Sequence, residues 1–141
     1  MKKPSSETLA RFRVVAHGLL RIVPALLMMQ HGAQKLFGAL GGAGGSGEAV
    51  PLFSLLGLAG ILEFFVAALV VIGLFTRPAA LLLAVEMAVA YLMAHAPMGF
   101  WPISNGGEPA LLLLFVFLYL ATAGPGPWSL DARREASRKR L

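Results

Sequence analysis

Six residues at helical spacing lie within the first apolar stretch of the chain. They recur at intervals of 4, 3, 4, 3 and 4 residues and so share one face of an α-helix. They are His17, Arg21, Pro24, Met28, His31 and Lys35. Their imidazole, guanidinium and ammonium groups can pair with carboxylates, and histidine can also move protons. Because hydrocarbon satisfies no polar group, this face is expected to point toward other helices or into a wet cavity.

Two carboxylates, Glu63 and Glu86, lie inside two further apolar stretches. Counted at about 1.5 Å per residue from one side of the membrane, Arg21 lies roughly 14 Å deep, Glu63 roughly 18 Å and Glu86 roughly 12 Å. We therefore expect an intramembrane charge network in which Arg21 pairs with Glu63 or Glu86. Since two acids share one base, one carboxylate is expected to hold a proton at neutral pH. The network either fixes helix register or serves as a proton path or an anchor for a redox ligand.

A second polar cluster is expected near the opposite side, where the first and third stretches end and the fourth begins. Histidine and lysine beside aromatic and apolar walls can hydrogen-bond a quinone carbonyl and exchange protons. The candidate ligand site comprises His31, Gln34, Lys35, His95, Trp101, Asn105 and Glu108. The alternative is structural: Glu108 stabilises its own helix dipole, and Lys35 extends toward the interface.

Other cofactor chemistry is not indicated. The three histidines lie at three depths, so no metal or haem site is expected. The chain has no cysteine, which excludes thiol catalysis and cysteine-ligated clusters. The glycine-rich segment 38–51 contains GxGxxG, but no strand precedes it and no αβ unit surrounds it. We interpret it as a mobile tether.

The elements that carry these residues are those of a membrane protein. The chain has 141 residues, of which 57% are hydrophobic and 13% charged, and its mean hydropathy is +0.75. A soluble domain of this size cannot bury so much apolar surface. Four stretches approach the roughly 20 residues needed to cross a bilayer, and the predicted spans are 12–37, 52–75, 78–95 and 108–123. The prediction is an all-α transmembrane four-helix bundle that forms one domain over residues 1–141.

The basic residues predict the orientation of this bundle. Ten of the twelve lie before the first span, between the second and third, or after the fourth. The positive-inside rule therefore places both termini in the cytoplasm, with 128–141 as a basic tail and 38–51 as an outer loop. The N-terminus resembles a signal peptide, but Arg21, His31 and Lys35 interrupt its apolar run, so we expect a retained span. A multi-pass protein of the bacterial inner membrane is predicted. Nucleic-acid binding is not, because the basic residues lack interleaved aromatic residues.

Several motifs between residues 20 and 131 together indicate a family. They are 21–24 (RIVP), 31–38 (HGAQKLFG), Glu63, 73–79 (GLFTRPA), 87–90 (MAVA), 100–102 (FWP), 105–108 (NGGE) and 124–131 (GPGPWSLD). With them the chain resembles the DoxX family of small bacterial and archaeal membrane proteins. The resemblance implies a four-helix membrane bundle. It also implies a role as a subunit of thiosulfate:quinone oxidoreductase, or as an anchor in oxidoreductase assemblies linked to thiol and oxidative stress.

Two functions of different class remain open. The first is a quinone-interacting subunit of a membrane oxidoreductase assembly; quinone is then the candidate cofactor, and electrons and any sulfur chemistry come from a partner. The second is a non-catalytic membrane scaffold that anchors a partner protein. A proton or small-solute transporter is a third, although four spans are few unless a dimer forms the path. The expected partners are membrane lipid and either another protein or a second copy of the chain.

Overall fold

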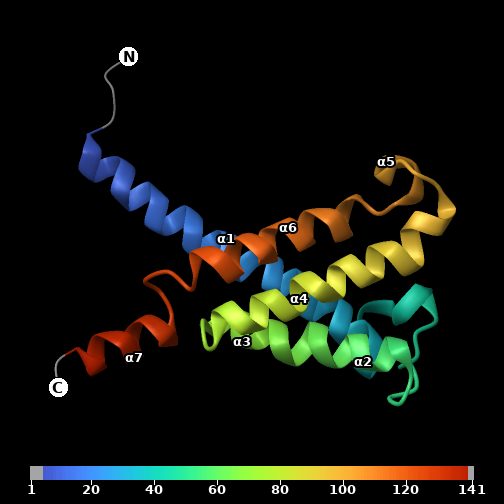
Figure 1. Cartoon of the computed structure of the whole chain (residues 1–141). Helices are drawn as coiled ribbons and strands as arrows, with labels where there is room; N and C mark the ends of the chain where they lie inside the picture. The colour runs from blue at the N-terminus through green and yellow to red at the C-terminus, as the bar shows by residue number, and fades with distance from the viewer. Residues whose placement is uncertain (1–4, 140–141) are drawn as a thin grey trace.

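The computed structural model describes residues 5–139, which are helical with no strand among them (Figure 1). The elements are α1 (Ser6–Phe37), η1 (Ala39–Gly41), η2 (Ala43–Gly45), α2 (Leu55–Ile61), η3 (Leu62–Val66), α3 (Ala67–Ile72), α4 (Thr76–Ala90), η4 (Tyr91–His95), η5 (Ala96–Met98), α5 (Pro102–Asn105), α6 (Glu108–Ala123) and α7 (Leu130–Arg138). Of these, η3 and η4 are π-helical turns that continue the helices around them, so α2, η3 and α3 form one helical segment.

Three helical segments are long and apolar enough to cross a membrane: Ser6–Phe37, Leu55–Ile72 and Thr76–Met98. The helix α6 is apolar but shorter, at 16 residues. The second segment begins where the Ser54 hydroxyl accepts the Gly57 N–H, and it ends at Gly73, whose φ of 69° suits glycine.

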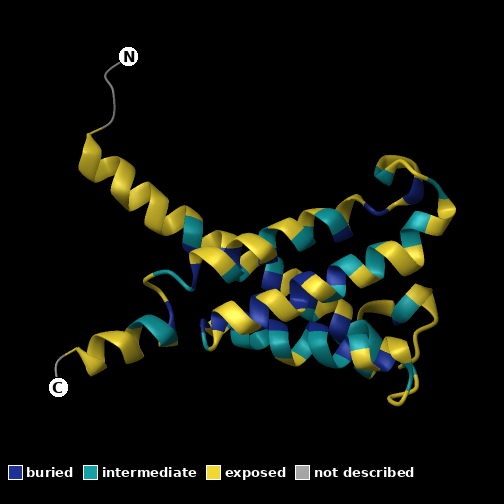
Figure 2. Ribbon diagram, in the orientation of Figure 1, coloured by how far each residue is buried: buried dark blue, intermediate teal, exposed yellow. Residues whose placement is uncertain are grey.

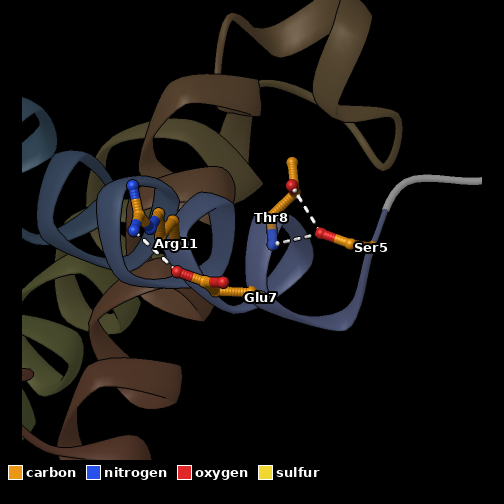
Figure 3. A network of polar contacts seen from close by, with 4 residues as sticks. All are labelled: Ser5, Glu7, Thr8 and Arg11. Atoms are coloured by element: carbon orange, nitrogen blue, oxygen red, sulfur yellow. Dashed lines mark hydrogen bonds and ion pairs between the residues drawn. The ribbon is translucent and has the colours of Figure 1, made fainter.

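The helix α1 begins earlier than the predicted residue 12. Ser5 caps it by accepting the N–H of Thr8, and Arg11 donates to Glu7 at 2.7 Å (Figure 3). Residues 5–16 are exposed all round, and this part of α1 projects beyond the other helices (Figures 1 and 2). The cap and the first turns therefore lengthen the helix outside the packed region.

The helices pack through small residues and a narrow apolar core. One face of α1 contacts α2, η3 and α3, while α4 runs along α6 and also contacts η3 and α3. The core includes Ala25, Met28, Val70, Leu83, Phe117 and Leu120. A Cβ on Gly32 would lie 2.5 Å from the backbone nitrogen of Phe64, so glycine permits this close approach of α1 and η3. Many large apolar residues are exposed on the outer surface, as lipid contact requires; exposed positions are yellow in Figure 2.

The two ends of the packed region differ. We call residues 73–76 and 124–131 the turn end, and residues 38–54 and 99–107 the loop end; the start of α1 and the helix α7 lie beyond the turn end (Figure 1). At the turn end α4 has no cap of its own, since its N-cap residue is Phe75. Asp131 supplies one: its carboxylate accepts the N–H of Phe75 at 3.0 Å and of Thr76 at 2.9 Å.

Replacement of Asp131 by alanine is expected to lower stability by about 1 kcal/mol at neutral pH, because two N–H groups of α4 lose their acceptor. Burial raises the pKa of Asp131, but the hydrogen bonds from Thr76 and Phe75 outweigh it, so its pKa lies below the usual range. The contribution is therefore present above the pKa of the unfolded state and is lost as the pH falls through the folded pKa. Thermal unfolding midpoints in detergent, at neutral and acidic pH, measure this.

The control is Glu135→Ala, which removes another carboxylate from α7 that accepts no N–H of α4. An equal loss of stability in both variants would contradict the capping role of Asp131.

Candidate functional site

A cavity of about 680 Å³ lies between α1, the α2–η3 segment, the α4–η4 segment and the first turns of α6. Its wall is mostly apolar, with Leu55, Leu58, Leu62, Leu82, Val89 and Met93 among the lining residues. Five ionisable side chains interrupt this wall: His31, Lys35, Glu63, Glu86 and His95. The size, the apolar wall and the few converging polar groups are typical of a small-molecule site.

Lys35 and Glu63 form an ion pair in this wall. The Nζ atom of Lys35 donates to both carboxylate oxygens of Glu63, at 2.6 and 2.5 Å. The side chains are 17% and 6% exposed, so the pair is largely removed from solvent. It joins the last turn of α1 to η3 and neutralises both charges.

Glu86 lies in the same wall without such a partner. Both of its carboxyl oxygens are buried, and neither has a hydrogen-bond partner within residues 5–139. A buried carboxyl group without a partner is costly, and most such groups are hydrogen-bonded. Glu86 therefore has hydrogen-bonding capacity left for a ligand.

The π-helical turns η3 and η4 carry two of the five side chains, Glu63 and His95. A π turn holds more residues than an α turn and is frequent at functional sites. The ring of His95 stacks on Tyr91, and its Nδ1 lies 3.0 Å from the carbonyl oxygen of Asn105. Because a carbonyl oxygen only accepts, Nδ1 carries a proton, which leaves Nε2 as the acceptor of the neutral ring.

Of the seven residues predicted to form the ligand site, His31, Lys35 and His95 line the cavity, and the other four do not. Gln34 donates to the carbonyl of Leu40 at 3.3 Å. Asn105 braces the loop, donating to Gly99 and accepting the N–H of Gly107, each at 2.8 Å. Trp101 and Glu108 are exposed, and Glu108 is the first residue of α6, where an acid favours the helix dipole.

The expected pairing of Arg21 with Glu63 or Glu86 is wrong. Arg21 is buried at the turn end, where its Nη2 donates to the carbonyl of Trp128 at 2.5 Å. The predicted depth counts from residue 12, but residue 12 lies in the part of α1 that projects beyond the turn end, so Arg21 lies less deep than predicted. Arg21 is level with Gly73, since a Cβ there would overlap its Nη1. Glu63 is ten residues from Gly73, or about 15 Å along the helix, and its cation is Lys35.

Substitution of Lys35 by methionine is expected to cost about 3 kcal/mol of stability, because it leaves the Glu63 carboxylate buried and unpaired. The double substitution Lys35→Met with Glu63→Leu should recover most of this loss, since it removes both charges. Unfolding midpoints of the purified variants in detergent give the comparison. A double variant no more stable than Lys35→Met would argue against the ion pair as the cause.

The comparisons with known proteins place the chain in a family. The family model described as DoxX matches residues 16–96. An uncharacterised protein of Haemophilus influenzae is 41% identical over 130 residues, which cover 87% of this chain and 93% of that protein. An uncharacterised membrane protein of Mycobacterium tuberculosis is 33% identical over 86 residues, 54% of this chain and 53% of that protein. No solved structure matches the chain at a significant level. With its apolar helices and this match, the chain is an integral membrane protein that belongs to the DoxX family.

Proposed function

We propose that this protein binds a membrane quinone in the cavity and serves as the quinone-interacting subunit of an oxidoreductase assembly. The observation that supports the proposal most is the carboxyl group of Glu86, which is buried in an apolar wall beside the Lys35–Glu63 pair and has no hydrogen-bond partner among residues 5–139. A quinone head group offers carbonyl oxygens on an apolar ring. It therefore needs hydrogen-bond donors set in an apolar wall, and the cavity provides both.

The cavity is accessible from lipid. Leu58, Val85 and Met93 line it and are more than half exposed on the outer surface, so the space opens between the α2 and α4 segments. A ligand with an isoprenoid tail can enter there and leave the tail among lipid chains. Bound in this way, the head group lies beside polar side chains from α1, η3 and α4.

Three of the polar residues that line the cavity have a task in this proposal: Glu86, His31 and His95. Glu86 in its neutral form donates a hydrogen bond to one carbonyl oxygen, and His31 donates to the other. Reduction of a quinone to a quinol takes two electrons and two protons. Glu86 and His31 supply protons, while His95 accepts and returns them at the loop end through Nε2. The electrons come from a partner subunit, since the chain has no cysteine to ligate an iron–sulfur cluster.

We also propose that four helices cross the bacterial inner membrane, with the turn end on the cytoplasmic side. The basic residues Arg77, Arg133, Arg134 and Arg138 lie at or beyond the turn end, as the positive-inside rule requires of a cytoplasmic face. The helix α6 spans about 24 Å. It packs along α4 over its length, which supports its place as the fourth span.

Protein purified in native-lipid particles is expected to yield quinone on solvent extraction, quantified by chromatography. Glu86→Ala and His31→Ala should reduce occupancy by about tenfold each, because each removes one hydrogen-bond donor to a quinone carbonyl. Two matched variants outside the cavity lining, Glu108→Ala and Gln34→Ala, should retain it. Well-folded wild-type protein that carries no quinone and binds neither added menaquinone nor added ubiquinone would overturn the proposal and favour the scaffold.

The proposed topology is testable because the chain has no cysteine. Single cysteines in place of Ser46, Ser104 and Ser137 each mark one segment. In intact spheroplasts a membrane-impermeant maleimide should label the Ser46→Cys and Ser104→Cys variants, and label Ser137→Cys only after permeabilisation. Labelling of Ser104→Cys and Ser137→Cys from the same side would contradict α6 as a fourth span.

A further inference from the structure

The helix α7 carries a basic face. At 100° per residue, Arg133, Arg134 and Arg138 fall on one side of the helix with Leu130. All three arginines are exposed, and within residues 5–139 none forms an ion pair. The acids of α7 are engaged elsewhere, Asp131 with α4 and Glu135 with Lys139. No ion pair within the described part of the chain therefore engages these three charges.

This face is held in a fixed place rather than on a loose tail. Ser129 caps α7 by accepting the N–H of Ala132 at 3.1 Å, and the N–H of Asp131 donates to Gly73 at 2.9 Å. Arg21 donates a hydrogen bond to the carbonyl oxygen of Trp128, the residue before Ser129. These bonds tie the start of α7 to α1 and to the turn before α4, so the helix begins beside the turn end (Figure 1).

The surroundings of α7 have the character of a lipid headgroup region. Phe75 and Trp128 are 57% and 52% exposed at the turn end, and such aromatic side chains favour the membrane–water interface. The guanidinium of Arg134 lies 5.6 Å from the centre of the Phe75 ring. Arg134 thus lies beside an aromatic side chain of the kind that favours the membrane–water interface, near the level of lipid phosphates.

We propose that the basic face of α7, formed by Arg133, Arg134 and Arg138, binds the headgroups of anionic phospholipids in the leaflet next to the turn end. Basic clusters directly after a membrane helix attract anionic headgroups, and each charge contributes separately. Lipid is favoured over an acidic protein because the exposed aromatic residues place the face at headgroup level. The inference does not depend on quinone binding, since α7 lies at the end opposite His95.

The test titrates the full-length protein in neutral detergent with phosphatidylglycerol or phosphatidylcholine and counts bound lipids by native mass spectrometry. The wild type should bind phosphatidylglycerol more tightly, and high salt should weaken this preference because it screens exposed charges. The triple variant R133Q/R134Q/R138Q should lose the preference by at least about tenfold. It keeps Ser129 and Asp131, so its unfolding midpoint should match the wild type.

The matched control is K3Q/R11Q/R13Q, which removes the same number of charges but leaves the basic face of α7 and the Glu135–Lys139 ion pair intact. It should keep the preference for phosphatidylglycerol. An equal loss in both variants would show a response to net charge alone and would overturn the proposal. A wild-type protein that shows no preference for phosphatidylglycerol would also overturn the proposal. An α7 that binds an acidic protein instead of lipid would give this result.

Discussion

The ion pair of Lys35 and Glu63 is largely removed from solvent, since the two side chains are 17% and 6% exposed. Their two hydrogen bonds join α1 to η3 on one side of the cavity. The pair depends on Gly32, which lets the backbone of η3 approach α1 closely. Two features follow from it: His31, one turn earlier on α1, is positioned at the cavity, and Glu86 is left without a cation among residues 5–139.

Within residues 5–139, two ionisable side chains are buried with incomplete hydrogen bonding, Arg21 and Glu86, and burial has a different consequence for each. Arg21 has one firm acceptor, and protein surrounds the rest of its guanidinium, so it anchors the turn end. The carboxyl group of Glu86 has no hydrogen-bond partner in the part of the chain that the structure describes, and it borders a cavity. In a bilayer both cost free energy. Only Glu86 borders a space in which a ligand could form hydrogen bonds and offset this cost, so the functional proposal centres on Glu86.

Hydropathy and helix-stop signals predict most of the fold. The fourth apolar stretch, 108–123, coincides with α6, because Pro109 suits a helix start and Gly124 ends it. The candidate site is only partly predictable, since counting residues gives the depth of a side chain but not the direction in which it points. A π turn shifts every later residue around the axis, and no periodicity indicates η3 or η4. Depth alone therefore predicts a separate network for Glu63 and Glu86, although they share the cavity with His31, Lys35 and His95.

Asp131, which caps α4, lies 56 positions after Phe75 and 55 positions after Thr76 in the sequence. During synthesis the first turn of α4 emerges long before its acceptor does, so its N–H groups stay uncapped until α6 and the start of α7 have been made. The turn end is therefore completed last, after the helices that line the cavity are available to pack. The fold is therefore complete only once α7 has been made. A chain that ends before Asp131 lacks the carboxylate that caps the first turn of α4.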